Sequence, residues 1–207
     1  MLLALVAALA CLAAVPSVAL ASRGIGVAPA GPVTKSGPMT ITDSNGIVIT
    51  CEVTYNETWN PAIRKIIGEV GAIITGGIAE ECEGENGILA VEAVILQLGM
   101  ATPKFYQSFR GILPNITSIL FVANPLRILI RYREVLMPLN TIGCLFQGPV
   151  GFDTGGGVNR LSWLRIQANQ FVPLRLQLFG PRMCPFNIRL EGTLAIEPPQ
   201  NLILLNQ

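Results

Sequence analysis

The chain has 207 residues, of which 51% are hydrophobic and only 13% charged, with 21 glycines, 15 prolines and no histidine. This composition excludes a disordered chain and argues against a coiled coil, and the length suits one domain. Without histidine, the chain has no His-based acid–base catalysis and no His-liganded metal site. A net charge of +1 gives no general attraction to nucleic acid, so we expect no such partner.

Residues 1–21 have the pattern of a signal peptide. Residues 2–14 are apolar without interruption, Pro16 breaks the run, and the Ala-Leu-Ala motif that ends at Ala21 has the small-x-small pattern of a signal peptidase site. We therefore expect cleavage after Ala21 and a secreted mature chain without a membrane-spanning segment. Two alternatives stay open, an uncleaved N-terminal membrane anchor and a lipoprotein acylated at Cys11.

Four cysteines remain once Cys11 leaves with the signal peptide, and they are Cys51, Cys82, Cys144 and Cys184. An even number in an exported chain predicts two disulfides. Of the three possible pairings we favour Cys51–Cys82 with Cys144–Cys184, because each closes a loop of about 30–40 residues within one half of the chain. Neither a metal nor another cofactor is expected, since the chain has no CxxC pair and no histidine.

The mature chain alternates between apolar and polar residues with a period of two, which is typical of half-buried β-strands. The pattern is clear in 47–55, and Asn45-Gly46 before it is a hairpin signal whose partner strand is 39–42. It returns in 174–178, where Leu174, Leu176 and Leu178 are expected to face the core, and in 188–197.

Two further segments differ from simple alternation. Residues 88–98 are apolar on both faces, which predicts a central strand. Asn60-Pro61 is a helix start, so we expect a short helix near 61–67, followed by a strand over 71–78. In all we expect a single all-β domain over 22–207: an antiparallel β-sandwich of about ten strands with one short helix and two disulfides. A barrel is the alternative.

The densest charge cluster is an acidic run whose members could bind a cation through carboxylate oxygens. Its acidic residues are Glu80, Glu81, Glu83 and Glu85. Their spacing is not that of an EF-hand loop. The competing interpretation is a solvated turn beside a disulfide.

A second candidate site is basic. Arg127, Arg131 and Arg133 share one face of the strand expected over 126–133, so they form a possible anion-binding site. Charge is also divided unevenly, with four basic and nine acidic residues over 22–100 but ten basic and four acidic residues beyond. Either the molecule is dipolar and associates through charge, or the two halves interleave and neutralise each other.

Motifs for enzymatic chemistry are sparse. The chain has no GxSxG or SxxK motif, and no cysteine is left over for a nucleophile. Glu92 lies in a strongly apolar segment, where burial would raise its pKa and make it a candidate general acid. The alternatives are a buried Arg–Glu pair or an edge position.

Four short motifs carry a resemblance to a known family. They are residues 105–117 (FYQSFRGILPNIT), 143–146 (GCLF), 184–185 (CP) and 190–194 (LEGTL). Together with the signal peptide they resemble a family of uncharacterised exported proteins of high-GC Gram-positive bacteria. The resemblance implies a secreted all-β domain and carries over no catalytic residue.

The sequence thus favours a secreted, non-enzymatic protein that binds a partner in the envelope or outside the cell. One alternative is a secreted hydrolase that uses carboxylates, with Glu92 and a member of the acidic run flanking the scissile bond. The other is a self-assembling envelope subunit that pairs through an exposed edge strand, such as 201–205.

Overall fold

The structure is a computed structural model and describes residues 24–28, 31–59, 70–96, 104–112, 115–154 and 160–205. Within these residues the chain forms eleven β-strands and no helix. The strands are β1 (Gly24–Ala28), β2 (Gly31–Asp43), β3 (Val48–Trp59), β4 (Val70–Glu83), β5 (Leu89–Leu96), β6 (Lys104–Ile112), β7 (Asn115–Glu134), β8 (Thr141–Asp153), β9 (Arg160–Ile166), β10 (Gln170–Phe179) and β11 (Asn187–Leu205). The helix expected near 61–67 lies outside the described residues.

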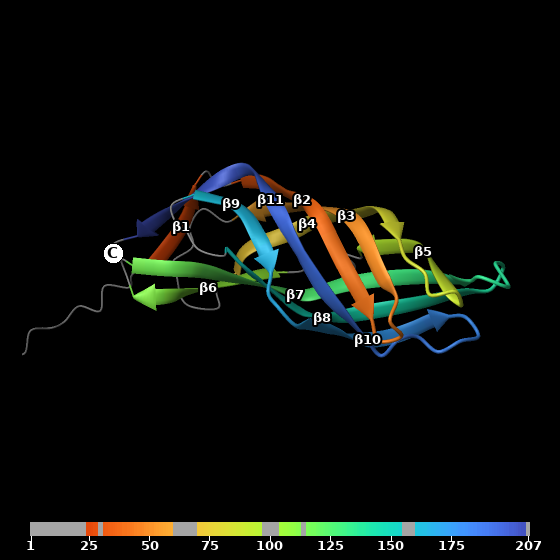
Figure 1. Ribbon diagram of the computed structural model, residues 1–207. Coiled ribbons are helices and arrows are strands. Elements are labelled where there is room, and N and C mark those ends of the chain that lie inside the picture. Colours follow the sequence, from red (N-terminus) through yellow and green to blue (C-terminus); the bar gives the residue numbers. More distant parts are fainter. Residues whose placement is uncertain are drawn as a thin grey trace, which may run out of the picture.

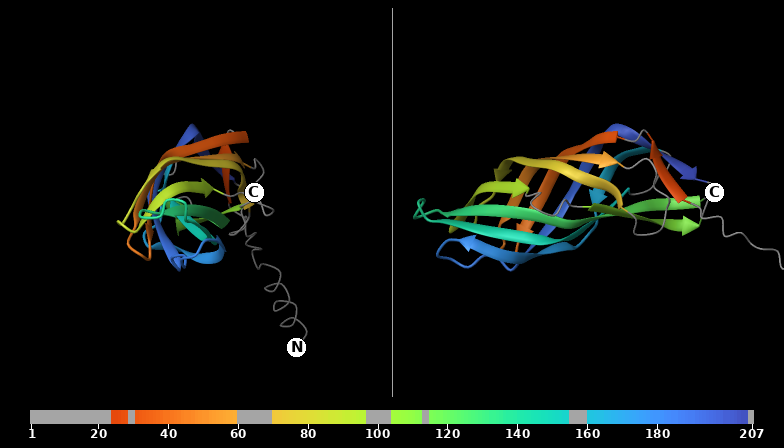
Figure 2. Two further views of the ribbon diagram at one scale, coloured as in Figure 1. Left: turned by 90° about the vertical axis from the view of Figure 1, so that its right-hand side faces the viewer. Right: turned by 180° about the vertical axis from the view of Figure 1, so that it is seen from behind.

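All strand pairs are antiparallel and follow the order β10-β8-β9-β11-β2-β3-β4-β6-β7-β5, with β1 beside β11. Strands β2, β3, β4 and β11 cross over β7, β8 and β10, and the molecule is elongated (Figures 1 and 2). Because β10 pairs with β11, and β6 pairs with both β4 and β7, hydrogen bonds join the two layers at both sides. The predicted all-β fold with antiparallel strands is confirmed.

The β2–β3 hairpin forms where Asn45-Gly46 predicts it. Strands β2 and β3 pair from Thr42 opposite Val48 to Gly31 opposite Trp59. Gly46 has φ +85°, a conformation that glycine adopts without strain. The Asp43 carboxylate accepts the backbone amides of Asn45 and Ile47, at 2.8 and 3.0 Å, and so closes the turn.

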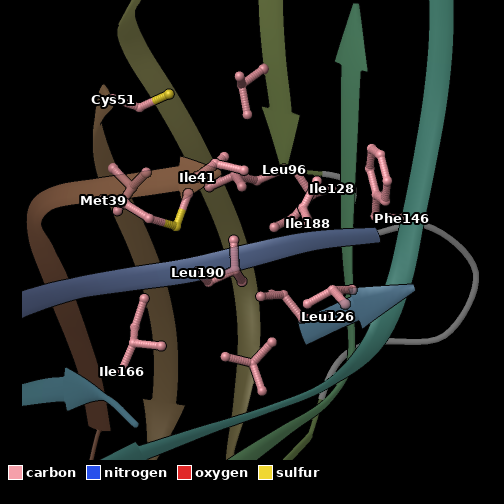
Figure 3. Packing of buried hydrophobic residues seen from close by; sticks show 14 of the residues in the cluster. Met39, Ile41, Cys51, Leu96, Leu126, Ile128, Phe146, Ile166, Ile188 and Leu190 are labelled. Carbon is pink, nitrogen blue, oxygen red and sulfur yellow. The ribbon is translucent and has the colours of Figure 1, made fainter. Parts of the chain in front are cut away.

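Inward-facing residues of the two layers form one apolar core, as Figure 3 shows. Ile41 of β2 and Leu190 of β11 lie on one side, and Ile128 of β7 and Phe146 of β8 lie on the other; all four are fully buried. The alternation predicted for 47–55 and 188–197 is confirmed, because every second residue there is buried apart from Gly192.

Both predicted disulfides are present. Cys51–Cys82 joins β3 to β4, and Cys144–Cys184 joins β8 to the connection between β10 and β11. Each bridge therefore ties neighbouring parts of the fold rather than its two termini.

The orientation predicted for 174–178 is wrong, because Leu176 and Leu178 are exposed. Beyond Pro173, β10 no longer pairs with β11 and lies beside β8 alone. Its register shifts on either side of Leu176 and Gln177, so alternation along this stretch does not carry every second residue into the core.

Two edge predictions are also wrong. Residues 88–98 do not form a central strand, since β5 is the last strand of the order and pairs along its length only with β7. A bulge between Val91 and Ala93 changes which residues face inward, and Ile95 is exposed. The segment 201–205 is not a free edge, because β1 pairs with it throughout.

Candidate functional site

The acidic run ends β4 and continues into the turn before β5. Glu80, Glu81, Glu83 and Glu85 are all exposed. Their side chains do not converge, and in the part of the chain that the structure describes no three Asp, Glu, Cys or His side chains gather into a possible metal site. The run therefore has the geometry of a solvated strand end beside the Cys51–Cys82 disulfide.

The three arginines of the predicted anion site lie on the polar face of β7, as expected, but do not act together. The Arg127 Nε donates to Gln147 Oε1 at 3.0 Å, and Arg131 pairs with Glu92 at 3.3 Å. The Glu92 side chain is 36% exposed, so the burial expected of a general acid is absent. Of the three arginines, only Arg133 lines another candidate site, which is the cavity described next.

Arg133 and two members of the acidic run line one open cavity of about 580 Å³. Its lining is formed by Thr50, Cys82, Glu83, Gly84, Glu85, Ala90, Val91 and Arg133. Gly84 is required there, because a Cβ atom would lie 2.5 Å from the Val48 carbonyl oxygen of β3. The cavity presents charges of both signs to solvent, which suits a polar ligand, and Glu92 does not line it.

A buried ion pair lies inside the fold. Lys35 Nζ of β2 is 2.7 Å from Glu57 Oε2 of β3, and the two side chains are 1% and 0% exposed. The Lys35 ammonium also lies 5.7 Å from the centroid of the Phe121 ring. Burial lowers the pKa of Lys35, and the neighbouring Glu57 carboxylate opposes that effect.

This pair was not predicted from the sequence, although the alternation contains it. Lys35 occupies an inward position of β2 between Val33 and Met39, and Glu57 continues the inward series of β3 beyond Tyr55. Extending the period of two past the apolar residues would have placed both charges in the core. Since neither side chain reaches solvent, the pair has the position of a structural element rather than of a surface site.

The most unusual surface feature is what we call the apolar end, where five large apolar side chains on two neighbouring loops are more than half exposed. They are Leu136, Met137 and Leu139 of the β7–β8 loop, and Met183 and Phe186 of the segment that leads from β10 to β11. Leu139 is 96% exposed, Leu136 89% and Met183 87%. Both loops lie at the same end of the molecule (Figures 1 and 2).

Several polar contacts hold the two loops of the apolar end in place. The Glu134 carboxylate accepts Arg182 Nε at 2.6 Å and Asn140 Nδ2 at 3.4 Å, which joins one loop to the other. These two hydrogen bonds lower the pKa of Glu134, the larger part coming from Arg182. The Cys144–Cys184 disulfide adds a covalent bond between the second loop and β8.

The second loop is also organised from within. The Gln177 amide donates to the carbonyl oxygens of Gly180 and Arg182, at 2.9 and 2.8 Å, and accepts the Cys184 amide at 3.2 Å. Gly180 has φ +106°, and a Cβ atom there would lie 2.6 Å from the Thr141 carbonyl oxygen. Hydrogen bonds and a disulfide therefore hold the base of a loop whose apolar side chains are exposed to solvent.

Among the residues that the structure describes, no helix is long and apolar enough to cross a membrane. No protein-family model, curated protein or solved structure gives a significant match to the chain.

Proposed function

We propose that this chain is an exported, non-enzymatic binding protein that meets its partner through the apolar end. The observation that carries this proposal is the exposure of five large apolar side chains on two loops that an ion pair, a disulfide and the Gln177 amide hold in place. Exposed apolar patches on ordered surfaces mark interaction sites. The two disulfides support export, since such bonds persist in oxidising compartments.

The test compares retention of envelope and extracellular material by immobilised protein with and without the apolar end. Leu136→Ser with Leu139→Ser removes two fully solvated side chains, so the fold is expected to be unchanged. Ile78→Ser with Ile95→Ser is the matched control, because both residues are exposed apolar positions on β4 and β5. We expect the loop variant to lose retained material that the control keeps, and equal retention by both would contradict the proposal.

A hydrolase remains the second candidate, because the open cavity contains two carboxylates, Glu83 and Glu85. Retaining and inverting glycosidases need such a pair within about 5–10 Å. The arginine in the same cavity and the exposure of both glutamates favour binding of a polar ligand instead. Hydrolysis of envelope polysaccharide that disappears in Glu83→Gln and Glu85→Gln would establish the enzyme.

A further inference from the structure

We infer that the apolar end binds the surface of an anionic lipid bilayer, with its loop tips inserted among the lipids and its arginines at the headgroups. This inference rests on the proposed function and names the partner of the same surface. Three observations carry it: the shape of the surface, its charge, and the size of the two loops.

The exposed apolar side chains lie on protruding loop tips. Leu136 and Leu139 lie on one tip and Met183 on another, and each is at least 87% exposed. The two tips project from the same end of the molecule (Figure 1). Protruding apolar side chains are best buried by a deformable partner. The boundary between lipid headgroups and acyl chains can bury such residues to a depth of about 5–10 Å.

The charge of this region is complementary to an anionic surface. Residues 133–140 and 170–191 carry four arginines and two glutamates, a net charge of +2. Glu134 is paired with Arg182, and Glu191 with Arg189. Arg175 is exposed and makes no ion pair within the described residues, and it lies next to Leu174, whose amide donates to the Phe186 carbonyl at the base of the second loop. Basic side chains beside an inserted apolar tip attract anionic lipids.

The size and charge of the loops argue against the other occupants. A standard protein interface takes about 20–30 residues from each partner, whereas the loops 135–140 and 180–186 offer six and seven. A second copy meeting this surface about a two-fold axis would bring Arg175 and Arg182 close to the same residues of the other copy. An anionic bilayer does not require a large protein interface, because two small loops can insert into it. Its negative charge also attracts the arginines and does not repel them.

The experiment is co-sedimentation of the purified chain with vesicles of phosphatidylcholine containing one quarter phosphatidylglycerol, against vesicles of phosphatidylcholine alone. We expect binding to the anionic vesicles that weakens between about 0.1 M and 1 M salt, as the Debye length falls from about 10 Å to 3 Å. Leu136→Ser with Leu139→Ser should weaken binding at least about tenfold. Arg175→Gln should weaken it about fivefold, at low salt only.

Ile78→Ser with Ile95→Ser is again the matched control and should bind as the wild-type protein does. All variants share the same N-terminal residues, so any contribution of that segment to vesicle binding is the same in each of them. A second readout uses Leu139→Trp, whose fluorescence should shift to the blue with anionic vesicles and be quenched by lipids brominated near the headgroup. If the apolar end inserts into the bilayer, both the blue shift and the quenching should be observed.

Three outcomes would overturn the inference. The first is equal vesicle binding by the loop variant and the control. The second is a wild-type protein that binds no vesicles but dimerises through Leu136 and Leu139, which would assign the surface to a second copy. The third is a wild-type protein that binds no vesicles yet retains a polypeptide in a manner that depends on these leucines. In the last two cases the proposed binding function stands and only its lipid partner is wrong.

Discussion

The Tyr132 hydroxyl donates a hydrogen bond to Asp43 Oδ2 at 3.0 Å, and both residues are buried. Tyr132 belongs to β7, whereas Asp43 ends β2, so the bond spans the core from one layer to the other. The other oxygen of the same carboxylate accepts the amides of the β2–β3 turn. One side chain therefore closes a hairpin and fixes its distance from the opposite layer.

Replacing Tyr132 by Phe should lower the free energy of unfolding by about 1.5–3 kcal/mol, because a buried acceptor loses its donor. Tyr55→Phe is the matched control: Tyr55 is also buried, but its hydroxyl has no hydrogen-bond partner among the described residues. That variant should be unchanged or more stable by up to about 1 kcal/mol. Urea denaturation of both oxidised variants measures the difference, and equal losses would contradict this account.

Removing one member of the buried ion pair should cost far more than removing both. Lys35→Met leaves the Glu57 carboxylate buried without its lysine, which should lower the free energy of unfolding by about 3–5 kcal/mol. Lys35→Met combined with Glu57→Leu should recover most of this loss, because neither charge of the pair is then buried. Denaturant unfolding of the single and double variants tests this, and additive losses would show that the pair is not coupled.

The pH dependence of stability should contain a contribution from Glu134. Its pKa is lowered by hydrogen bonds in the folded state, so the contribution is present above the ordinary glutamate pKa and is lost as the pH falls through the lower folded value. Glu134→Gln should therefore be less stable than the wild-type protein at neutral pH. The two should converge in acid, where the wild-type carboxyl is protonated. Urea midpoints measured across this range test the prediction, and a constant difference would contradict it.

The two disulfides should contribute similarly to the free energy of unfolding, but only one of them should matter for vesicle binding. In the chain-entropy relation their separations of 31 and 40 residues correspond to about 3.7 and 3.9 kcal/mol. Cys51→Ala with Cys82→Ala and Cys144→Ala with Cys184→Ala should therefore lose similar stability. Only the loss of Cys144–Cys184 should weaken vesicle binding, since Cys184 anchors a loop of the apolar end. Equal loss of binding by both variants would show that the loop needs no such anchor.

Much of the fold could be predicted because alternation and turn chemistry are local. Residues 47–55 have an unbroken period of two, and Asn45-Gly46 supplies the turn, so the hairpin needed no knowledge of the rest of the chain. Loop length favoured one disulfide pairing among three, and the structure has that pairing. The charged cavity was less predictable, because Arg133 of β7 and the glutamates at the end of β4 are distant in sequence.

The sequence by itself determined that this chain forms strands and where several of them turn, and it favoured one disulfide pairing among three. Only the tertiary structure decided which faces are covered. Leu176 has the same local pattern as Leu190, yet it is exposed, because β10 has left β11 at that point. Lys35 is polar, yet it is buried, because a layer closes over it. Alternation distinguishes the two faces of a strand, but burial depends on what lies opposite each face, and that is a property of the assembled layers.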